Sequence, residues 1–244
     1  MNIIFLILGA IFGSFFNVCI YRIPNGKSII NPPSSCGSCD HILNFRDMVP
    51  VIGYFLNRGR CRYCGEKYSI RYALVELLTA VSFLLVYIKM GLAFEILFIL
   101  AIVSMIIIMI FIDLDHHIIP DGLNLLIGLS GLAYGIYNNT SIKSMILGFL
   151  VGGVIIFIVA IIGPMGGGDI KLFAALGIWL GPLYTSFAIV ISFILGGIIG
   201  VLLIVLKIKG RKDHIAFGPF IGIAGLMMIL FGNEIINWYI TLVI

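Results

Sequence analysis

Residues 92–112 read LAFEILFILAIVSMIIIMIFI, and this run decides the fold class of the chain. Glu95 and Ser104 are the only polar residues in it. A helix needs about 20 mostly apolar residues to cross the roughly 30 Å of hydrocarbon in a bilayer. The run is therefore expected to be a membrane span.

The rest of the chain has the same character. Hydrophobic residues make up 61% of its 244 residues and charged residues 11%, whereas about 25% of a soluble domain is charged. So little charge cannot cover a surface in water, and most of the chain must lie in lipid.

Further apolar runs complete the predicted architecture. Those of sufficient or nearly sufficient length are 3–20, 72–88, 144–162, 183–206 and 217–242. Two weaker candidates are 122–137 and 170–181, of which the second ends at the turn signal Gly181-Pro182. We predict an all-α polytopic membrane protein with about eight transmembrane helices.

The basic residues predict how these spans are oriented. If 21–71, 113–121, 163–171 and 207–216 are cytosolic linkers, only Lys89 and Lys143 of the 15 Lys and Arg residues fall on the other side. The cytosolic ones are then Arg22, Lys27, Arg46, Arg58, Arg60, Arg62, Lys67, Arg71, Lys171, Lys207, Lys209, Arg211 and Lys212. Short cytosolic loops carry such an excess. No basic leader or small-residue cleavage site flanks 3–20, so we expect a first span with its N-terminus outside.

The linker 21–71 contains two cysteine pairs, Cys36-x-x-Cys39 and Cys61-x-x-Cys64. Two such knuckles can supply four thiolates to one tetrahedral zinc ion. Two disulfides or four idle thiols are the alternatives, but disulfides rarely persist in the cytosol. We therefore predict a structural zinc site and expect the metal to supply much of the folding energy of this loop. Gly37 and Gly65, beside the cysteines, suit tight knuckle turns.

Acidic side chains cluster where two predicted spans meet the cytosolic face. Asp113, Asp115 and Asp121 surround the end of the run 92–112, and Asp169 follows the glycines Gly166–Gly168. Two carboxylates brought together there can share a proton and activate water, and the glycines permit a close approach by an extended substrate. Each acid can also be a helix cap or a solvated loop residue, which is what we expect of Asp115 and Asp121.

Glu76 lies inside the predicted span 72–88. A carboxylate at that depth needs a partner, and Arg71 is the candidate nearest in sequence.

Six segments occur in an order that resembles one known family. They are Gly13–Pro24 (GSFFNVCIYRIP), the two cysteine pairs, Arg71–Glu76, Ile112–Asp121, Gly166–Leu172 (GGGDIKL) and Ala216–Phe220 (AFGPF). Together they resemble the bacterial type IV prepilin peptidases, also called leader peptidase/N-methyltransferases, over nearly the whole chain. In that family the first catalytic aspartate lies seven residues before a proline, so the resemblance selects Asp113 over Asp115 and pairs it with Asp169.

The resemblance implies a function. Members of the family cut the leader from prepilins and pseudopilins after a glycine, at the cytosolic face of the bacterial inner membrane. Many then methylate the new N-terminus using S-adenosylmethionine. It implies catalytic residues Asp113 and Asp169, a substrate-proximal loop of Gly166, Gly167, Gly168 and Lys171, and zinc ligands Cys36, Cys39, Cys61 and Cys64. We expect prepilins and lipid as partners and no nucleic acid.

The same comparison implies a division of the chain. We expect residues 1–21 to be the first span, 22–71 the zinc loop and methyltransferase region, and 72–244 the transmembrane aspartic peptidase. No glycine-rich nucleotide fingerprint marks a methyl-donor site, so its residues are not predicted and a peptidase without methyltransferase activity is an alternative. A proton or cation transporter is another, although the acids cluster at one face. A zinc scaffold that only binds partners would leave the glycine–aspartate segment unexplained.

Overall fold

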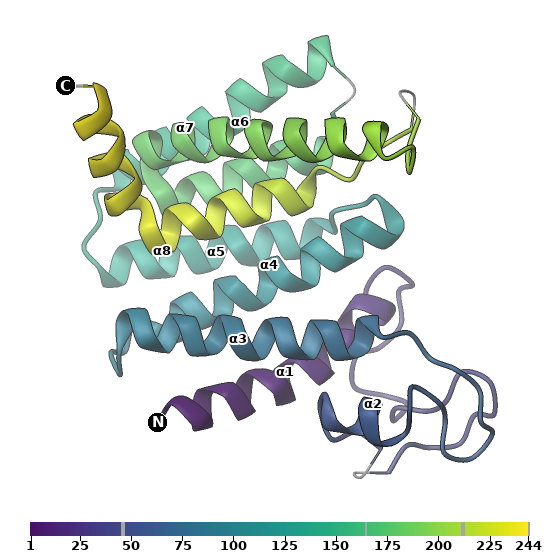
Figure 1. Ribbon diagram of the computed structural model, residues 1–244. Coiled ribbons are helices and arrows are strands. Elements are labelled where there is room, and N and C mark those ends of the chain that lie inside the picture. Colours follow the sequence, from purple (N-terminus) through teal and green to yellow (C-terminus); the bar gives the residue numbers. More distant parts are fainter. Residues whose placement is uncertain (45–46, 164, 211–212, 244) are drawn as a thin grey trace. The chain divides into compact units, whose positions relative to one another are not determined.

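The computed structural model describes residues 1–44, 47–163, 165–210 and 213–243 (Figure 1). Arg46, Arg211 and Lys212 of the predicted charge pattern, and Pro164 beside the glycine loop, lie outside the described residues. The helices are α1 (Asn2–Arg22), α2 (Ile52–Leu56), α3 (Arg71–Met90), α4 (Ile96–His116), α5 (Asp121–Tyr137), α6 (Ile142–Ile162), α7 (Gly167–Val205) and α8 (Gly218–Val243). The described residues outside the helices form only two isolated β-bridges, so the all-α prediction is confirmed.

The helices match the predicted spans closely. In the part of the chain that is described, six helices are long and apolar enough to cross a membrane, namely α1, α3, α4, α6, α7 and α8. The chain is thus a multi-pass membrane protein. α4 begins and ends four residues later than the predicted run 92–112, so Asp113 lies on its last turn rather than after it.

α7 is too long to be a single straight span. Its 39 residues would extend about 58 Å, almost twice the thickness of the hydrocarbon. Gly181 has φ 69° and ψ 175° and breaks the helix, at the turn that Gly181-Pro182 predicts. α5, with 17 residues, is slightly short for a span. The count of about eight spans remains a prediction.

The chain divides into two compact units, Met1–Ile108 and Met109–Ile244, and α4 contributes to both. In the first unit α1 packs along α3. Gly9 and Gly13 make this possible, because a Cβ at Gly13 would lie 2.6 Å from the Cα of Glu76 and one at Gly9 2.7 Å from the Cα of Ala80. Small residues four positions apart let helix backbones approach closely in membranes.

Glu76 connects this helix pair to the loop between α1 and α3. Its Oε2 accepts a hydrogen bond of 2.6 Å from the backbone N–H of Val51, and the Ser14 side chain is also within hydrogen-bonding reach of its carboxylate. Sequence analysis suggested Arg71 as the partner of Glu76. The hydrogen bond comes instead from Val51, which lies 25 positions before Glu76. The polar end of the helix pair thereby holds the loop in place.

The second unit is built around α7. The first part of α7 crosses α6 where Gly148 and Gly177 meet so closely that a Cβ on either would overlap the other's carbonyl oxygen. α5 runs beside the same part of α7 in the same direction, with Gly128 facing Ala175 and Gly131 facing Trp179.

The course of α7 sets the geometry at one end of the unit. After Gly181 its second part returns, so that Gly196 lies against Phe217, just before α8. The C-terminal end of α4 and the N-terminal ends of α5, α7 and α8 therefore gather at one end of the unit. We call this the four-helix end.

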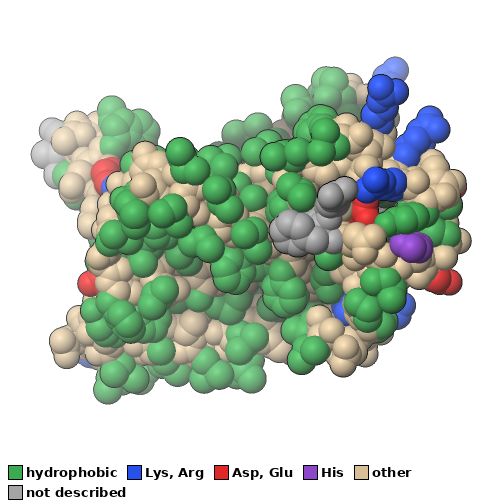
Figure 2. Space-filling model, turned by 90° about the horizontal axis from the view of Figure 1, so that it is seen from below, with side chains coloured by type: hydrophobic (Ala, Val, Ile, Leu, Met, Phe, Trp, Pro, Cys, Tyr) green, Lys and Arg blue, Asp and Glu red, His purple; other side chains and the backbone are tan. Residues whose placement is uncertain are grey.

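The exterior fits a lipid environment. On the face drawn in Figure 2, hydrophobic side chains are spread over much of the surface, with few charged side chains among them. Many large apolar residues on the spans are exposed, such as Ile162, Ile136 and Val205. A soluble protein does not expose apolar surface on this scale.

Candidate active site and metal centre

Asp113 lies on the last turn of α4 with only 4% of its surface exposed. Its Oδ2 accepts a hydrogen bond of 2.8 Å from the backbone N–H of Gly218, the first residue of α8. A Cβ at position 218 would stand 2.6 Å from that oxygen. Glycine is therefore required here, because only a residue without a side chain lets the start of α8 approach the carboxylate so closely.

Asp169 has a similar arrangement on the first turn of α7. It is 8% exposed, and its Oδ2 accepts a hydrogen bond of 3.1 Å from the backbone N–H of Gly166, the residue that caps the helix. A carboxylate in the first turn also interacts favourably with the positive end of the helix dipole.

The two carboxylates share a distinctive environment. Each is buried at the four-helix end, and each has one oxygen held by a glycine N–H. They lie within range of each other's charge. Two carboxylates brought together in this way can share one proton and activate a water molecule.

The other acids of this region behave differently. Asp115 is exposed. Asp121 is exposed as well and forms an ion pair with Lys171, with 2.7 Å between Oδ1 and Nζ. The helix cap of α5 is Pro120 rather than Asp121. The structure therefore brings together Asp113 and Asp169 and leaves Asp115 and Asp121 at the surface.

The three glycines of the loop have different surroundings. Gly166 donates to Asp169, a Cβ at Gly167 would meet open space, and a Cβ at Gly168 would lie 3.0 Å from the Cβ of Ile119. None of them has a positive φ. Their small size matters here for close approach rather than for backbone conformation.

The four loop cysteines converge in the first unit. The Sγ atoms of Cys36, Cys39, Cys61 and Cys64 all lie within 4.8 Å of one another. The two knuckles have the same hydrogen bonds: Cys36 N–H donates to His41 O and Asp40 N–H to Cys36 O, while Cys61 N–H donates to Glu66 O and Gly65 N–H to Cys61 O. Asp40 and Gly65 both have positive φ. The turn position that sequence analysis gave to Gly37 thus belongs to Asp40.

This geometry fits a metal ion better than disulfides. All four cysteines are free, and the Sγ atoms of Cys36 and Cys64 are 3.8 Å apart. A tetrahedron with zinc–sulfur distances of about 2.3 Å has edges of about 3.8 Å. Backbone N–H groups of Ser38 and Cys39 lower the pKa of Cys36 to about 7. For Cys64 the N–H of Glu66 favours the thiolate, but burial and the three neighbouring sulfurs raise its pKa to about 12. A cation at the centre of the four sulfurs would stabilise them as thiolates.

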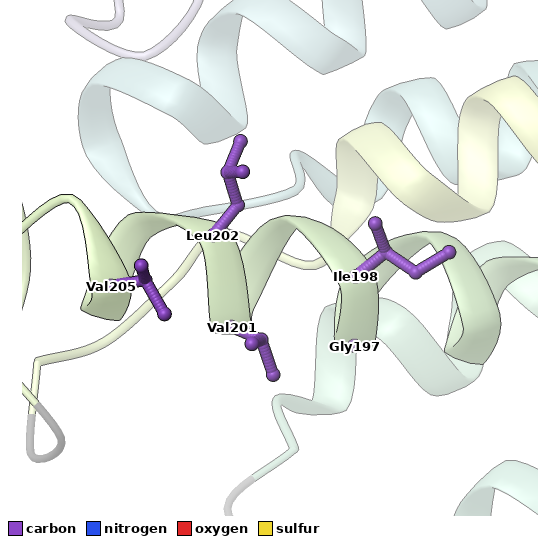
Figure 3. A pocket seen from close by; sticks show the side chains of 5 residues that line it. All are labelled: Gly197, Ile198, Val201, Leu202 and Val205. Carbon is purple, nitrogen blue, oxygen red and sulfur yellow. The ribbon is translucent and has the colours of Figure 1, made fainter.

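A shallow apolar hollow of about 470 Å³ lies on the second part of α7. Its lining residues Gly197, Ile198, Val201, Leu202 and Val205 all come from one helix (Figure 3). None of them is titratable, so the hollow is a lipid-facing surface rather than a site of chemistry.

Comparison with known proteins assigns this sequence to a family. Residues 7–90 match the family model described as "Bacterial Peptidase A24 N-terminal domain", and residues 99–201 match the "Type IV leader peptidase family". The chain is 34% identical over 259 residues to the prepilin leader peptidase/N-methyltransferase of Legionella pneumophila, which covers 93% of this chain and 90% of the relative. The chain belongs to the type IV leader peptidase family.

Another member of the leader peptidase family, the prepilin leader peptidase/N-methyltransferase of Bacillus subtilis strain 168, is 32% identical over 98% of each chain. No solved structure gives a significant match. The leader peptidase match contains Asp113 and Asp169, and the N-terminal match contains the four cysteines and Glu76. The resemblance found from the sequence is confirmed.

Some contacts in this leader peptidase family member have no signal in the sequence. Gly218 is the hydrogen-bond donor to a carboxylate 105 residues away, and only its place in a family segment distinguished it. Asn124 is buried in α5, and neither amide atom has a hydrogen-bond partner among the described residues. A polar residue in an apolar helix was the only available hint of that burial.

Proposed function

We propose that the protein cleaves the leader from type IV prepilins and pseudopilins after a glycine, and that it methylates the new N-terminus with S-adenosylmethionine. The names of the relatives include both activities, prepilin leader peptidase and N-methyltransferase. The observation that supports the peptidase assignment most directly is the pair of buried carboxylates, Asp113 and Asp169, each held by a glycine N–H in the second unit.

In this proposal Asp113 and Asp169 are the catalytic residues. The ionised member of the pair accepts a proton from water, and the water oxygen attacks the carbonyl carbon of the leader's last glycine. The protonated member donates to the carbonyl oxygen. When the tetrahedral intermediate collapses the C–N bond breaks, and the leaving amine takes up a proton from the pair. The glycine N–H groups hold both carboxylates in place throughout.

Gly166, Gly167, Gly168 and Lys171 then form the loop beside the substrate. Gly167 supports this role, because the space around it is open. The ion pair between Lys171 and Asp121 joins the starts of α7 and α5 next to Asp169. A prepilin would present its cleavage site along this edge of the four-helix end.

We place the four-helix end at the cytosolic face of the bacterial inner membrane, with the N-terminus of the chain outside. The residues at this end include Lys171 near the start of α7 and Lys207 and Lys209 after its end, whereas Lys143 lies at the start of α6, which runs toward the four-helix end from the other side. That asymmetry agrees with the positive-inside rule.

Cys36, Cys39, Cys61 and Cys64 are assigned to structural zinc. The four-sulfur arrangement supports a closed tetrahedral site, which has no open position for catalysis. We assign residues 22–71 to the methyltransferase region and 72–244 to the peptidase. A proton or cation pathway is less well supported, because the buried acids of the second unit are at one end rather than spread through its depth.

Substitution of each aspartate tests the peptidase assignment. Asp113→Asn and Asp169→Asn should each reduce cleavage of a purified prepilin in detergent by at least about a thousandfold, on the scale seen when a general acid or base is lost together with electrostatic stabilisation. Asp115→Asn is the matched exposed control and should retain most of the activity. Efficient cleavage by either of the first two variants, with membrane insertion intact, would refute the assignment.

A further inference from the structure

The peptidase leaves one buried acid without a role. Glu76 lies in the first unit, on the second turn of the span α3, with 9% of its surface exposed. Ionisable groups within spans are costly and usually functional. Because Asp113 and Asp169 belong to the other unit, the chemistry of the pair does not account for this carboxylate.

Its described partners are neutral. The carboxylate is held by the N–H of Val51 and the side chain of Ser14, and no salt bridge to it is found in the described parts of the chain. A structural carboxylate inside a membrane normally pairs with a cation. Two neutral donors orient the group, and among the described residues no cationic side chain is bonded to it, so the carboxylate can accept a cationic partner.

Three segments build this position. Gly13 and Ser14 of α1 are pressed against Glu76, since a Cβ at Gly13 would meet its Cα at 2.6 Å and its carbonyl oxygen at 3.2 Å. One turn further along α1, Asn17 donates to the carbonyl of Tyr72 with a distance of 3.0 Å. The loop contributes Val51, a β-branched residue with φ 61° and ψ −57°. A non-glycine residue in that region is strained and persists only where its surroundings impose the conformation.

We propose that Glu76 is the anionic residue of a cation-binding site for methyl transfer, formed where the loop 23–70 meets α1 and α3. This rests on the proposed methyltransferase function. Two cations enter that reaction, the ammonium group of the cleaved pilin and the sulfonium group of S-adenosylmethionine, and both have the chemistry that a desolvated carboxylate binds.

Methyl transfer to the pilin requires a group that accepts a proton from the ammonium form of its N-terminus, and a carboxylate can do this. S-adenosylmethionine supplies a methyl group on a positively charged sulfur, and that carbon–sulfur bond breaks with its electron pair staying on sulfur. The pilin amine attacks through its lone pair, so its ammonium form must first lose a proton. Glu76 can accept that proton, and the nitrogen then gains the methyl group and the positive charge. Val51 and Ser14 keep the carboxylate oriented during the exchange.

Glu76→Gln tests the proposal, because the amide keeps an oxygen for Val51 and removes only the charge. We expect methyl transfer from S-adenosylmethionine to a cleaved pilin peptide to fall at least tenfold relative to prepilin cleavage, while zinc content and melting temperature stay close to those of the unchanged protein. Glu76→Asp retains the charge and should recover part of the transfer. Glu95→Gln, at the other end of the spans in the same unit, is the matched control.

Binding measurements separate the two cations. If Glu76 faces the sulfonium, Glu76→Gln weakens binding of S-adenosylmethionine but not of S-adenosylhomocysteine, whose sulfur is neutral. If it faces the amine, the KM of the cleaved pilin peptide rises instead. Unchanged transfer and unchanged binding in Glu76→Gln, or equal losses in Glu95→Gln, would overturn the proposal. Absence of transfer by the unchanged protein would instead refute the methyltransferase function.

Discussion

Gly218→Ala is the substitution whose effect on cleavage follows most directly from the structure. The new Cβ would stand 2.6 Å from Asp113 Oδ2, 3.1 Å from its Cγ and 3.1 Å from Met109 Sδ. Folded proteins essentially never show such a contact below 3.0 Å. The carboxylate or the start of α8 must therefore move by about 0.4 Å to relieve the overlap, and by about 0.8 Å to reach an ordinary contact.

The expected loss of activity follows from that displacement. The movement stretches the 2.8 Å hydrogen bond between Gly218 and Asp113, and hydrogen bonds to charged groups contribute about 1.5–3 kcal/mol. A misplacement of about 1 Å at a reacting group costs on the order of a hundredfold in rate. We expect kcat for prepilin cleavage to fall about 10- to 100-fold, with KM changed less than about threefold.

A second glycine on α8 provides the control. A Cβ at Gly225 would meet Leu176 Cδ1 at 3.0 Å, so Gly225→Ala strains the same helix against a flexible side chain away from the carboxylates. Both variants are purified in detergent and compared for cleavage rate and melting temperature. Wild-type cleavage by Gly218→Ala, or an equal loss in Gly225→Ala, would refute the positioning role of Gly218.

Three further predictions concern metal content and stability. The purified protein should contain about one zinc per chain. Elemental analysis should show that Cys36→Ser and Cys64→Ser lose this zinc and that Cys19→Ala keeps it. Metal-free wild-type protein prepared without chelator would contradict this prediction. Gly181→Ala should lower the free energy of unfolding by about 2–4 kcal/mol. Gly181 has a φ of 69°, and a Cβ added there would lie 2.6 Å from Ser144 Oγ, so both the backbone and the neighbour oppose a side chain. Gly197→Ala, in open space, should leave the melting temperature unchanged. Asn124→Leu should raise the melting temperature, since two buried amide atoms without a described partner cost about 1–3 kcal/mol. Thr185→Val is the control and should not raise it, because the Thr185 hydroxyl already donates to Gly181 O at 2.6 Å. A lower melting temperature in Asn124→Leu would show that the amide is paired.

The helices were predictable because membrane spans depend on local properties. Length and hydrophobicity over about 20 residues determine a span, and the break in α7 was predictable because Gly181-Pro182 disfavours a helix by itself. The convergence of the four cysteines was equally predictable, since each knuckle is a local turn and the spacing of the two pairs predicts that they can share one metal ion.

Contacts between distant segments were not predictable in the same way. The Gly218 N–H reaches Asp113, and Val51 replaces Arg71 as the partner of Glu76, only because particular helices and loops pack together. Asp40 takes the knuckle turn expected of Gly37 because the hydrogen bonds, rather than glycine content, fix the turn. The local pattern favoured a cap or surface role for Asp115 and Asp121, and the family resemblance selected Asp113 and Asp169 as the expected catalytic pair.

The short length of two helices has a consequence for the lipid around them. α5 extends about 26 Å, and the part of α7 from Gly167 to Gly181 about 22 Å, whereas bilayer hydrocarbon is about 30 Å thick. Such hydrophobic mismatch is relieved by thinning the bilayer locally, at a modest cost for each ångström. Both short helices begin at the end that holds Asp113 and Asp169. We therefore expect a membrane of shorter acyl chains to fit this region with less deformation, and lipid thickness to affect how water and peptide reach the carboxylates.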